Sequence, residues 1–234
     1  MRTEVLGEPE VPDGGRHRNQ RKLRSSGVAW IGPIPDHWTV RRIIQVARLE
    51  SGHTPSRNEP RYWVPEECTI PWFTLGDIWQ VRQARKKYVR ETNEKISPTG
   101  IANSAARLLP AGTVILSRTA SVGFPAILAV PMATTQDFAN WICGPQIVPE
   151  YLYFVLRAMC PELHRLMIGS THQTIYLPDV HAFRMPLPPL EEQAEIVSLL
   201  MSEEERIDAL MAKKERAVEL LSAVADEVIG FVLP

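Results

Sequence analysis

The C-terminal stretch after Pro189 constrains the fold more than any other feature. No proline occurs between Pro189 and Pro234, and this run predicts one uninterrupted α-helix. Glu191 and Glu192 place negative charge in the first turn, where the helix dipole favours it. At 1.5 Å per residue, about 40 residues of helix span roughly 60 Å, several times the length of an average globular helix. The chain must therefore combine a globular part with a rod.

Apolar residues recur along the predicted helix at two positions of a heptad. We call this set the seam, and it comprises Ile196, Leu200, Ile207, Leu210, Leu221 and Val224. Glu203 and Lys214 interrupt it, at sites where a polar residue can fix the register of a pair. A single rod cannot bury such a seam by itself. Residues 190–234 are therefore predicted to form a coiled coil with another helix, which belongs to the same chain, to a second copy or to a different protein. The alternative is that the rod lies across its own domain.

The preceding residues predict a strand-rich α+β domain. Short apolar runs bounded by glycine and proline predict β-strands near residues 69–75, 126–130 and 140–143. Residues 108–117 predict a Pro-Ala-Gly turn followed by a buried strand. Residues 150–166 have apolar side chains at helical spacing, and Pro161 predicts a kink there. Residues 1–25 are polar and without periodicity, so they predict a disordered leader. The globular domain is accordingly assigned to residues 26–189, with the long helix outside it.

Charge divides between these two parts. Residues 1–189 contain 22 Lys and Arg against 16 Asp and Glu, a net charge of +6, whereas residues 190–234 contain 4 against 11, a net charge of −7. A basic surface suits phosphate groups, although so modest an excess is common among proteins that never meet nucleic acid. No apolar run approaches the ~20 residues needed to cross a bilayer. We expect a cytoplasmic protein without a membrane segment.

Motifs for catalysis or cofactor binding are missing from the sequence. It contains no glycine-rich phosphate loop, no nucleophile elbow and no His-Glu-x-x-His pattern. The three cysteines are widely spaced, without a pattern that indicates a disulfide or a zinc site. His164, His172 and His181 do not fall on one face of a helix or strand. We therefore expect no enzymatic activity, metal or cofactor in this chain. Only turnover by the purified chain would support the alternative that it is itself a nuclease or a methyltransferase.

Two polar loops are candidates for contact with a nucleic acid. The first, residues 117–123, offers hydroxyls and backbone N–H groups near a glycine, which suit phosphate oxygens. The second, residues 169–176, includes a glutamine amide that could read an adenine edge. The candidate contact residues of both loops are Arg118, Thr119, Ser121, Thr171, His172 and Gln173. The alternative is that both are tight turns whose hydroxyls bond to their own backbone.

A third candidate is a basic segment at residues 82–90, with five cations in nine residues. Within it, Arg85, Lys86 and Lys87 are expected to contact phosphates and position the domain on DNA. The alternative is a solvated charged face. Arg57 and Arg61, beside a proline-rich turn, are weaker candidates of the same kind.

Seven short motifs follow one another along the chain. They are Trp30-Ile31-Gly32-x-Ile34-Pro35-x-His37-Trp38, Gly52-x-Thr54-Pro55-Ser56, Ile70-Pro71-Trp72, residues 112–123, Thr135-Gln136-Asp137-Phe138, Gly169-Ser170-Thr171-His172, and residues 186–193. As an ordered set ending in a long helix, they resemble the specificity (S) subunits of Type I restriction-modification systems. The resemblance extends from about Gly27 to Leu221.

This resemblance implies a target recognition domain that reads one half of a bipartite site in double-stranded DNA, carried on a conserved helix. It also implies binding to methyltransferase (M) subunits, which carry S-adenosylmethionine and modify adenine, and to a restriction (R) subunit. Complete S subunits contain two recognition domains and two helices, whereas this chain has one of each. Three interpretations stay open. The chain is a half-subunit that forms a homodimer or pairs with a second recognition half, or a fragment of a longer protein, or a degenerate remnant. The alternative function is a coiled-coil adaptor that binds protein rather than DNA.

Overall fold

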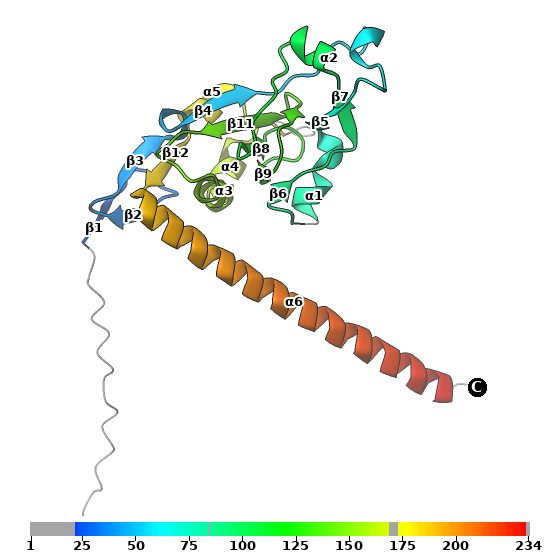
Figure 1. The fold of residues 1–234 in the computed structure, drawn as a ribbon. Coiled ribbons are helices and arrows are strands. Elements are labelled where there is room, and N and C mark those ends of the chain that lie inside the picture. The colour runs from blue at the N-terminus through cyan, green and yellow to red at the C-terminus, as the bar shows by residue number, and fades with distance from the viewer. Residues whose placement is uncertain (1–21, 84, 169–172, 233–234) are drawn as a thin grey trace, which may run out of the picture.

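The computed structural model describes residues 22–83, 85–168 and 173–232, with side-chain environments up to residue 225. It confirms the predicted architecture, a strand-rich mixed domain followed by one long helix (Figure 1). This helix, α6 (Leu190–Val232), starts at one corner of the domain and extends well beyond it. None of the described helices is long and apolar enough to cross a membrane.

The domain contains short strands, with few helices among them. The strands are β1 (Leu23–Ser25), β2 (Pro33–Pro35), β3 (Thr39–Arg42), β4 (Ala47–Ser51), β5 (Ile70–Phe73), β6 (Tyr88–Val89), β7 (Glu94–Ile96), β8 (Val114–Ser117), β9 (Pro125–Leu128), β10 (Ala133–Thr134), β11 (Phe138–Cys143) and β12 (Arg184–Leu187). The helices before α6 are α1 (Trp79–Arg82), α2 (Pro98–Ala102), α3 (Pro149–Ala158), α4 (Cys160–Leu166) and α5 (Leu177–Ala182), with 3-10 turns at Ile43–Gln45, Pro60–Tyr62 and Leu75–Asp77.

A five-stranded sheet, in the order β4-β11-β8-β9-β6, forms the centre of the domain. Strands β8 and β9 are buried along their whole length, which explains their nearly continuous apolar sequence. Val114 and Leu116 of β8 face the core cluster that contains α3, while Ile115 between them faces a second cluster with Phe73 and Phe138. The sheet is thus covered on both faces.

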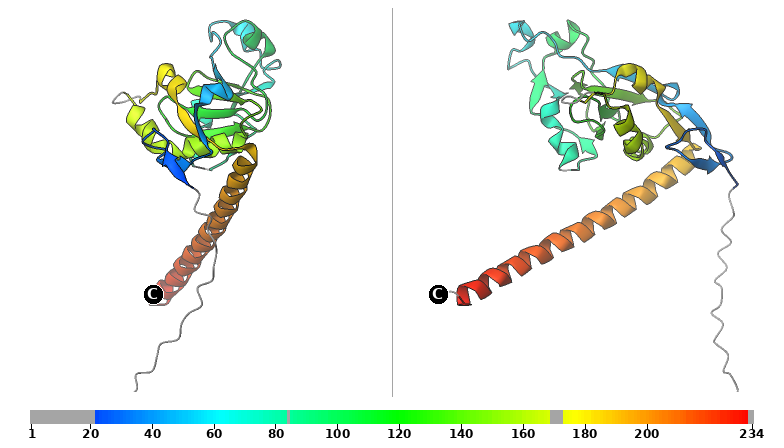
Figure 2. Two further views of the ribbon diagram at one scale, coloured as in Figure 1. Left: turned by 90° about the vertical axis from the view of Figure 1, so that its left-hand side faces the viewer. Right: turned by 180° about the vertical axis from the view of Figure 1, so that it is seen from behind.

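A smaller sheet, in the order β10-β5-β7, supports a lobe that includes α2 and the turn Pro60–Tyr62. Trp72 of β5 is 1% exposed and packs with Trp63 in a small core of its own. This lobe lies on the side of the domain away from α6 (Figure 2).

Of two predicted boundaries, one differs from the structure and the other agrees with it. The disordered leader was predicted to reach residue 25, which is wrong for its end, because Leu23–Ser25 form β1 and pair with β2. Arg24 holds this strand by donating to the carbonyl oxygens of Asp36 and Trp38. Residues 1–21 lie outside the described part. The predicted interruption near Pro161 is confirmed, since α3 ends at Ala158 and Pro161 lies in the first turn of α4, where its missing N–H costs nothing.

Two polar side chains at the start of α6 attach it to the domain. Gln193 is fully buried; its Oε1 accepts from the Val148 N–H at 3.0 Å, and its Nε2 donates to the Gln146 and Pro188 carbonyls at 3.0 and 2.9 Å. Glu192 accepts from the Trp38 indole N–H at 3.0 Å. These bonds fix the direction in which the helix leaves the domain.

Candidate nucleic-acid interface

The register of the central sheet brings the candidate segments to one place. Strand β11 pairs Phe138 with Ser117, the last residue of β8, and Ala139 with Ser51, the last residue of β4. Strands β9 and β6 run parallel and both begin at this same edge. We call this edge the loop end of the sheet, and it comprises residues 52–57, 85–87, 118–124 and 135–137. Segments that were separate candidates in the sequence therefore lie at the same end of one sheet, with residues 52–57 and 85–87 next to its two opposite edge strands.

The two polar loops are joined by backbone hydrogen bonds. Ala120 N donates to Gln173 O at 2.9 Å, and Ile175 N donates to Arg118 O at 2.9 Å. Thr119 and Thr174 form a β-bridge between these bonds. Residues 173–176 thereby extend the loop end. Thr171 and His172 lie outside the described residues, so their predicted contacts stay predictions.

In the first loop, several backbone N–H groups form internal hydrogen bonds, whereas two side-chain hydroxyls have no partner among the described residues. The backbone N–H groups of Arg118, Ser121 and Gly123 donate to Asp137, Thr119 and Ser117 at 2.8, 2.7 and 2.9 Å, so the expectation that such groups are free is wrong for these three. The hydroxyls of Thr119 and Ser121 have no partner among the described residues, nor has the exposed side-chain amide of Gln173. These side chains can therefore accept a ligand without breaking an internal bond.

Arg118 sits at the junction of the two loops and is only partly exposed. Its Nη1 donates weakly to the Ile175 carbonyl at 3.4 Å, while its buried Nε has no partner among the described residues. Burial lowers the pKa of Arg118, and the nearby Asp137 carboxylate acts in the opposite direction. The guanidinium remains a cation, since arginine is not deprotonated in proteins. Such an incompletely bonded cation favours an incoming anion.

The side chains of the basic segment 85–87 differ in their surroundings, because some are exposed to solvent and some contact α6. Lys86 is exposed, with its Nζ 5.8 Å from the centroid of the Trp79 ring. Arg85 is exposed and donates to the Met211 sulfur at 3.1 Å. Lys87 instead forms an ion pair with Glu204 of α6 at 2.7 Å, and its side chain is only 13% exposed. The placement of Lys87 does not support the predicted phosphate contact, because its ammonium group is already paired and covered.

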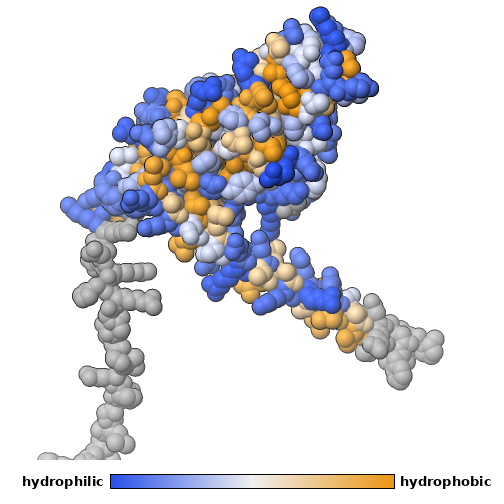
Figure 3. Space-filling model, in the orientation of Figure 1, coloured by the Kyte–Doolittle hydropathy of each residue, from blue (hydrophilic) through white to orange (hydrophobic). Residues whose placement is uncertain are grey.

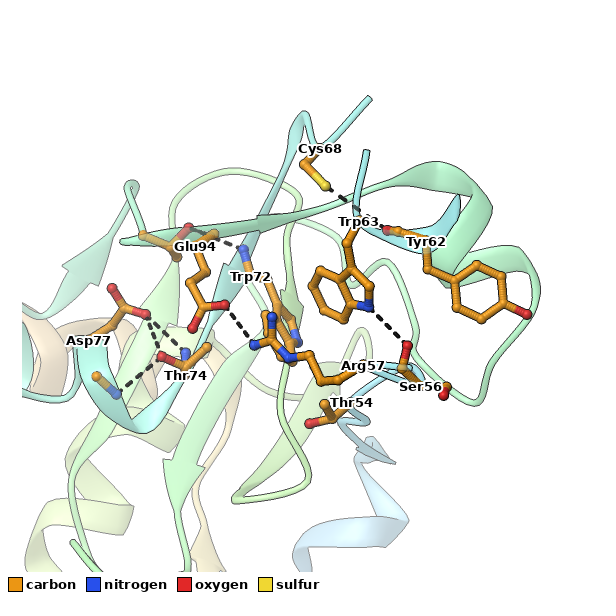
Figure 4. A network of polar contacts seen from close by, with 12 residues as sticks. Thr54, Ser56, Arg57, Tyr62, Trp63, Cys68, Trp72, Thr74, Asp77 and Glu94 are labelled. Atoms are coloured by element: carbon orange, nitrogen blue, oxygen red, sulfur yellow. Dashed lines mark hydrogen bonds and ion pairs between the residues drawn. The ribbon is translucent and has the colours of Figure 1, made fainter. Parts of the chain in front are cut away.

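A further basic group at the loop end, Arg57, was only a weak candidate from the sequence. Its guanidinium lies over the Trp63 ring and donates to Glu94 at 2.6 Å (Figure 4). Its position after the motif ending in Ser56 was visible in the sequence. Its partners were not, because they come from later elements that only the fold brings near.

Most of the seam of α6 is exposed, beside the face of the helix that contacts the domain. The domain contacts Gln193, Val197, Met201 and Glu204, which share one helical face by their spacing. The seam residues Ile207, Leu210 and Leu221 lie on another face and are 51, 56 and 71% exposed. Leu200 and Val224 are also exposed, whereas Ile196 is partly buried against the domain. Apolar side chains consequently reach the surface along α6 (Figure 3).

A metal centre has no support in the described residues. They contain no group of three or more His, Cys, Asp or Glu side chains that could hold an ion. Cys143 is a free thiol, and burial raises its pKa to about 12, which disfavours the reactive thiolate.

The domain is strand-rich, has polar loops at one end of its central sheet, and is carried on a long helix with an exposed apolar seam. These features define a class of recognition domain joined to a helical spacer. Residues 35–220 match the family model described as the Type I restriction modification DNA specificity domain. The chain therefore belongs to this family.

Two curated relatives and two solved structures illustrate the similarity. The chain is 30% identical over 200 residues to the Type I restriction enzyme MjaIX specificity subunit of Methanocaldococcus jannaschii, covering 85% of this chain and 44% of the relative. It is 23% identical to the EcoR124I/EcoR124II specificity subunit of Escherichia coli, covering 75% and 43%. The chain thus spans less than half the length of these relatives.

The solved structures share the fold. One is described as the structural basis of complex assembly and conformational transition of the type I R-M system, with a TM-score of 0.61, 22% identity, and coverage of 80% of this chain and 42% of the other. Another is the HsdS subunit from Thermoanaerobacter tengcongensis, with a TM-score of 0.57, 21% identity, and coverage of 80% and 41%.

Proposed function

We propose that this chain is a DNA-reading specificity component of a Type I restriction-modification system, and that its domain recognises one half of a bipartite site. The observation that carries the proposal is the loop end of the sheet, which presents arginine side chains together with hydroxyls and a side-chain amide that have no partner among the described residues. Membership of the specificity-domain family supports it. It also favours DNA recognition over the adaptor function that the sequence left open.

The residues at the loop end take different roles in this proposal. Arg85, Lys86 and Arg118 contact phosphates, and Thr119 and Ser121 bond phosphate oxygens or base edges. Gln173 presents its amide to an adenine. Lys87 serves the attachment of α6, because Glu204 already holds its ammonium group.

The chemistry of modification and cleavage belongs to other subunits in this proposal. The chain itself is non-catalytic and carries no cofactor. Methyltransferase subunits bind S-adenosylmethionine and a restriction subunit cuts, and the complex acts on chromosomal DNA in the cytoplasm.

The seam of α6 provides the contact with a second recognition half. A second copy of this chain is the simplest partner, because antiparallel pairing of two such helices sets one domain at each end of a rod. Each domain then meets the major groove on the same face of the DNA, one or more turns apart. The exposure of Ile207, Leu210 and Leu221 supports this pairing.

The test is a single-molecule methylome of the source cell with and without the gene. Loss of a bipartite N6-methyladenine motif with identical inverted halves is the expected result for a homodimer. Unlike halves would mean that the second recognition domain lies in another chain. If no motif disappears, the DNA-reading function is contradicted, and salt-insensitive binding of a protein partner would then indicate an adaptor.

A further inference from the structure

Arg57 is held in a defined orientation by aromatic rings. Its guanidinium carbon lies 4.0 Å from the centroid of the Trp63 ring and 5.0 Å from that of Trp72. Trp63 is itself fixed, since its indole N–H donates to the Ser56 carbonyl at 2.9 Å. Stacking of this kind orders the planar fork of an arginine before any ligand arrives.

Glu94 completes a charged pair with Arg57. Arg57 Nη2 donates to the Glu94 carboxylate at 2.6 Å, and the two side chains remain 52 and 45% exposed (Figure 4). Neither charged group has another hydrogen bond among the described residues. The pair therefore presents N–H donors and a carboxylate acceptor side by side to solvent.

The segment that carries Arg57 is anchored firmly to the loop end. His53 N donates to Thr134 O at 3.0 Å, and Thr54 Oγ1 bonds Gln136 Oε1 at 2.8 Å. A Cβ atom built on Gly52 would lie 2.1 Å from the Thr135 carbonyl oxygen, so the two backbones touch there. Asp137 O in turn accepts from the Arg118 N–H at 2.8 Å, so the segment that carries Arg57 is linked through residues 134–137 to the first polar loop.

We propose that the Arg57–Glu94 pair reads a G·C base pair in the major groove. Guanine presents two acceptors, O6 and N7, which match the arginine fork, and cytosine presents the N4 donor, which matches a carboxylate. One donor fork beside one acceptor therefore fits both halves of a single base pair. The inference rests on the proposed function, since it assigns one contact within the same interface.

The experiment measures base preference with the full chain bound to its methyltransferase subunit on a randomised DNA library. In R57A, discrimination at one base pair of the half-site should fall roughly ten- to hundredfold, while the other positions keep their preference. R57K retains the charge but not the fork, so it should lose the same discrimination. E94Q should weaken the preference at that same base pair.

The matched control is R61A, which removes an arginine of the same lobe that is 70% exposed and paired with Glu59 at 3.1 Å. It should leave every preference intact. Unchanged preference in R57A and R57K, or an equal loss of affinity for all sequences, overturns the proposal and leaves Arg57 a structural or phosphate-binding residue. If R57A does not fold, the E94Q variant provides the test: an unchanged base preference at every position of the half-site in E94Q overturns the proposal. A wild-type chain without any sequence preference would instead contradict the proposed function.

Discussion

At the scale of single residues, Arg118 combines partial burial with incomplete bonding, so removing its charge should affect DNA binding directly. R118Q should lower affinity for all DNA sequences and reduce the slope of log affinity against log salt by about 0.9. The slope is measured by titration at several salt concentrations. R41Q is the matched control, because Arg41 is an exposed arginine of β3, outside the candidate segments, whose side chain has no hydrogen bond or ion pair among the described residues. A slope in R118Q equal to that of the wild type would remove Arg118 from the phosphate contacts.

Gly52 gives a second prediction at this scale. In G52A the new methyl group would meet the Thr134 carbonyl at 2.4 Å and the Thr135 carbonyl at 2.1 Å, and backbone atoms cannot rotate away. The free energy of unfolding should fall by roughly 1–3 kcal/mol or more, as for overpacked sites. Denaturant unfolding measures it, with S56A as the control in the same loop, where the side chain is exposed. Wild-type stability in G52A would contradict the close approach.

At the scale of elements, Glu204 joins α6 to the sheet and to α3. It pairs with Lys87 at 2.7 Å and also with Arg157, and both cations lie near aromatic rings of α3. In E204A the two cations are left without their shared carboxylate. We expect a loss of roughly 1–3 kcal/mol in unfolding free energy, because Lys87 is largely covered, and a wider range of helix orientations.

Paired spin labels on the domain and on α6 measure that range as a distance distribution. E205Q is the control, since Glu205 is exposed and unpaired among the described residues. An unchanged distribution in E204A would show that Gln193 and the apolar contacts alone orient the helix.

The sequence predicted these elements well where local signals suffice. The proline-free run ending at Leu233 predicted α6, and the turn before Val114 predicted β8, because both patterns act through neighbouring residues. It could not show that Lys87 forms an ion pair, because its partner Glu204 lies on a different element. It also could not bring the two polar loops together, since that follows from the register of β8 and β11 and from the Thr119–Thr174 bridge.

At the scale of the whole molecule, the seam predicts self-association. I207D with L210D should abolish a dimer of the full chain, because charges at exposed seam positions cannot be buried in a helix pair. Sedimentation or light scattering measures the mass, and circular dichroism checks the fold. The control is L108D, which changes an apolar residue of the domain that is 52% exposed. A dimer of unchanged affinity in the double variant would place the interface elsewhere.

The attachment of α6 at Glu204 has a mechanical consequence. From there to Val232 the helix forms an arm of about 42 Å at 1.5 Å per residue. A tilt of about 5° at the attachment moves the far end by slightly more than one base-pair step of about 3.4 Å. Under the proposed pairing of two copies, the number of base pairs between the two half-sites would be governed by the angle at which α6 leaves the domain as much as by the length of the helix. A few side chains where α6 attaches to the domain, distant from any base, would thus help to set the spacing between the half-sites.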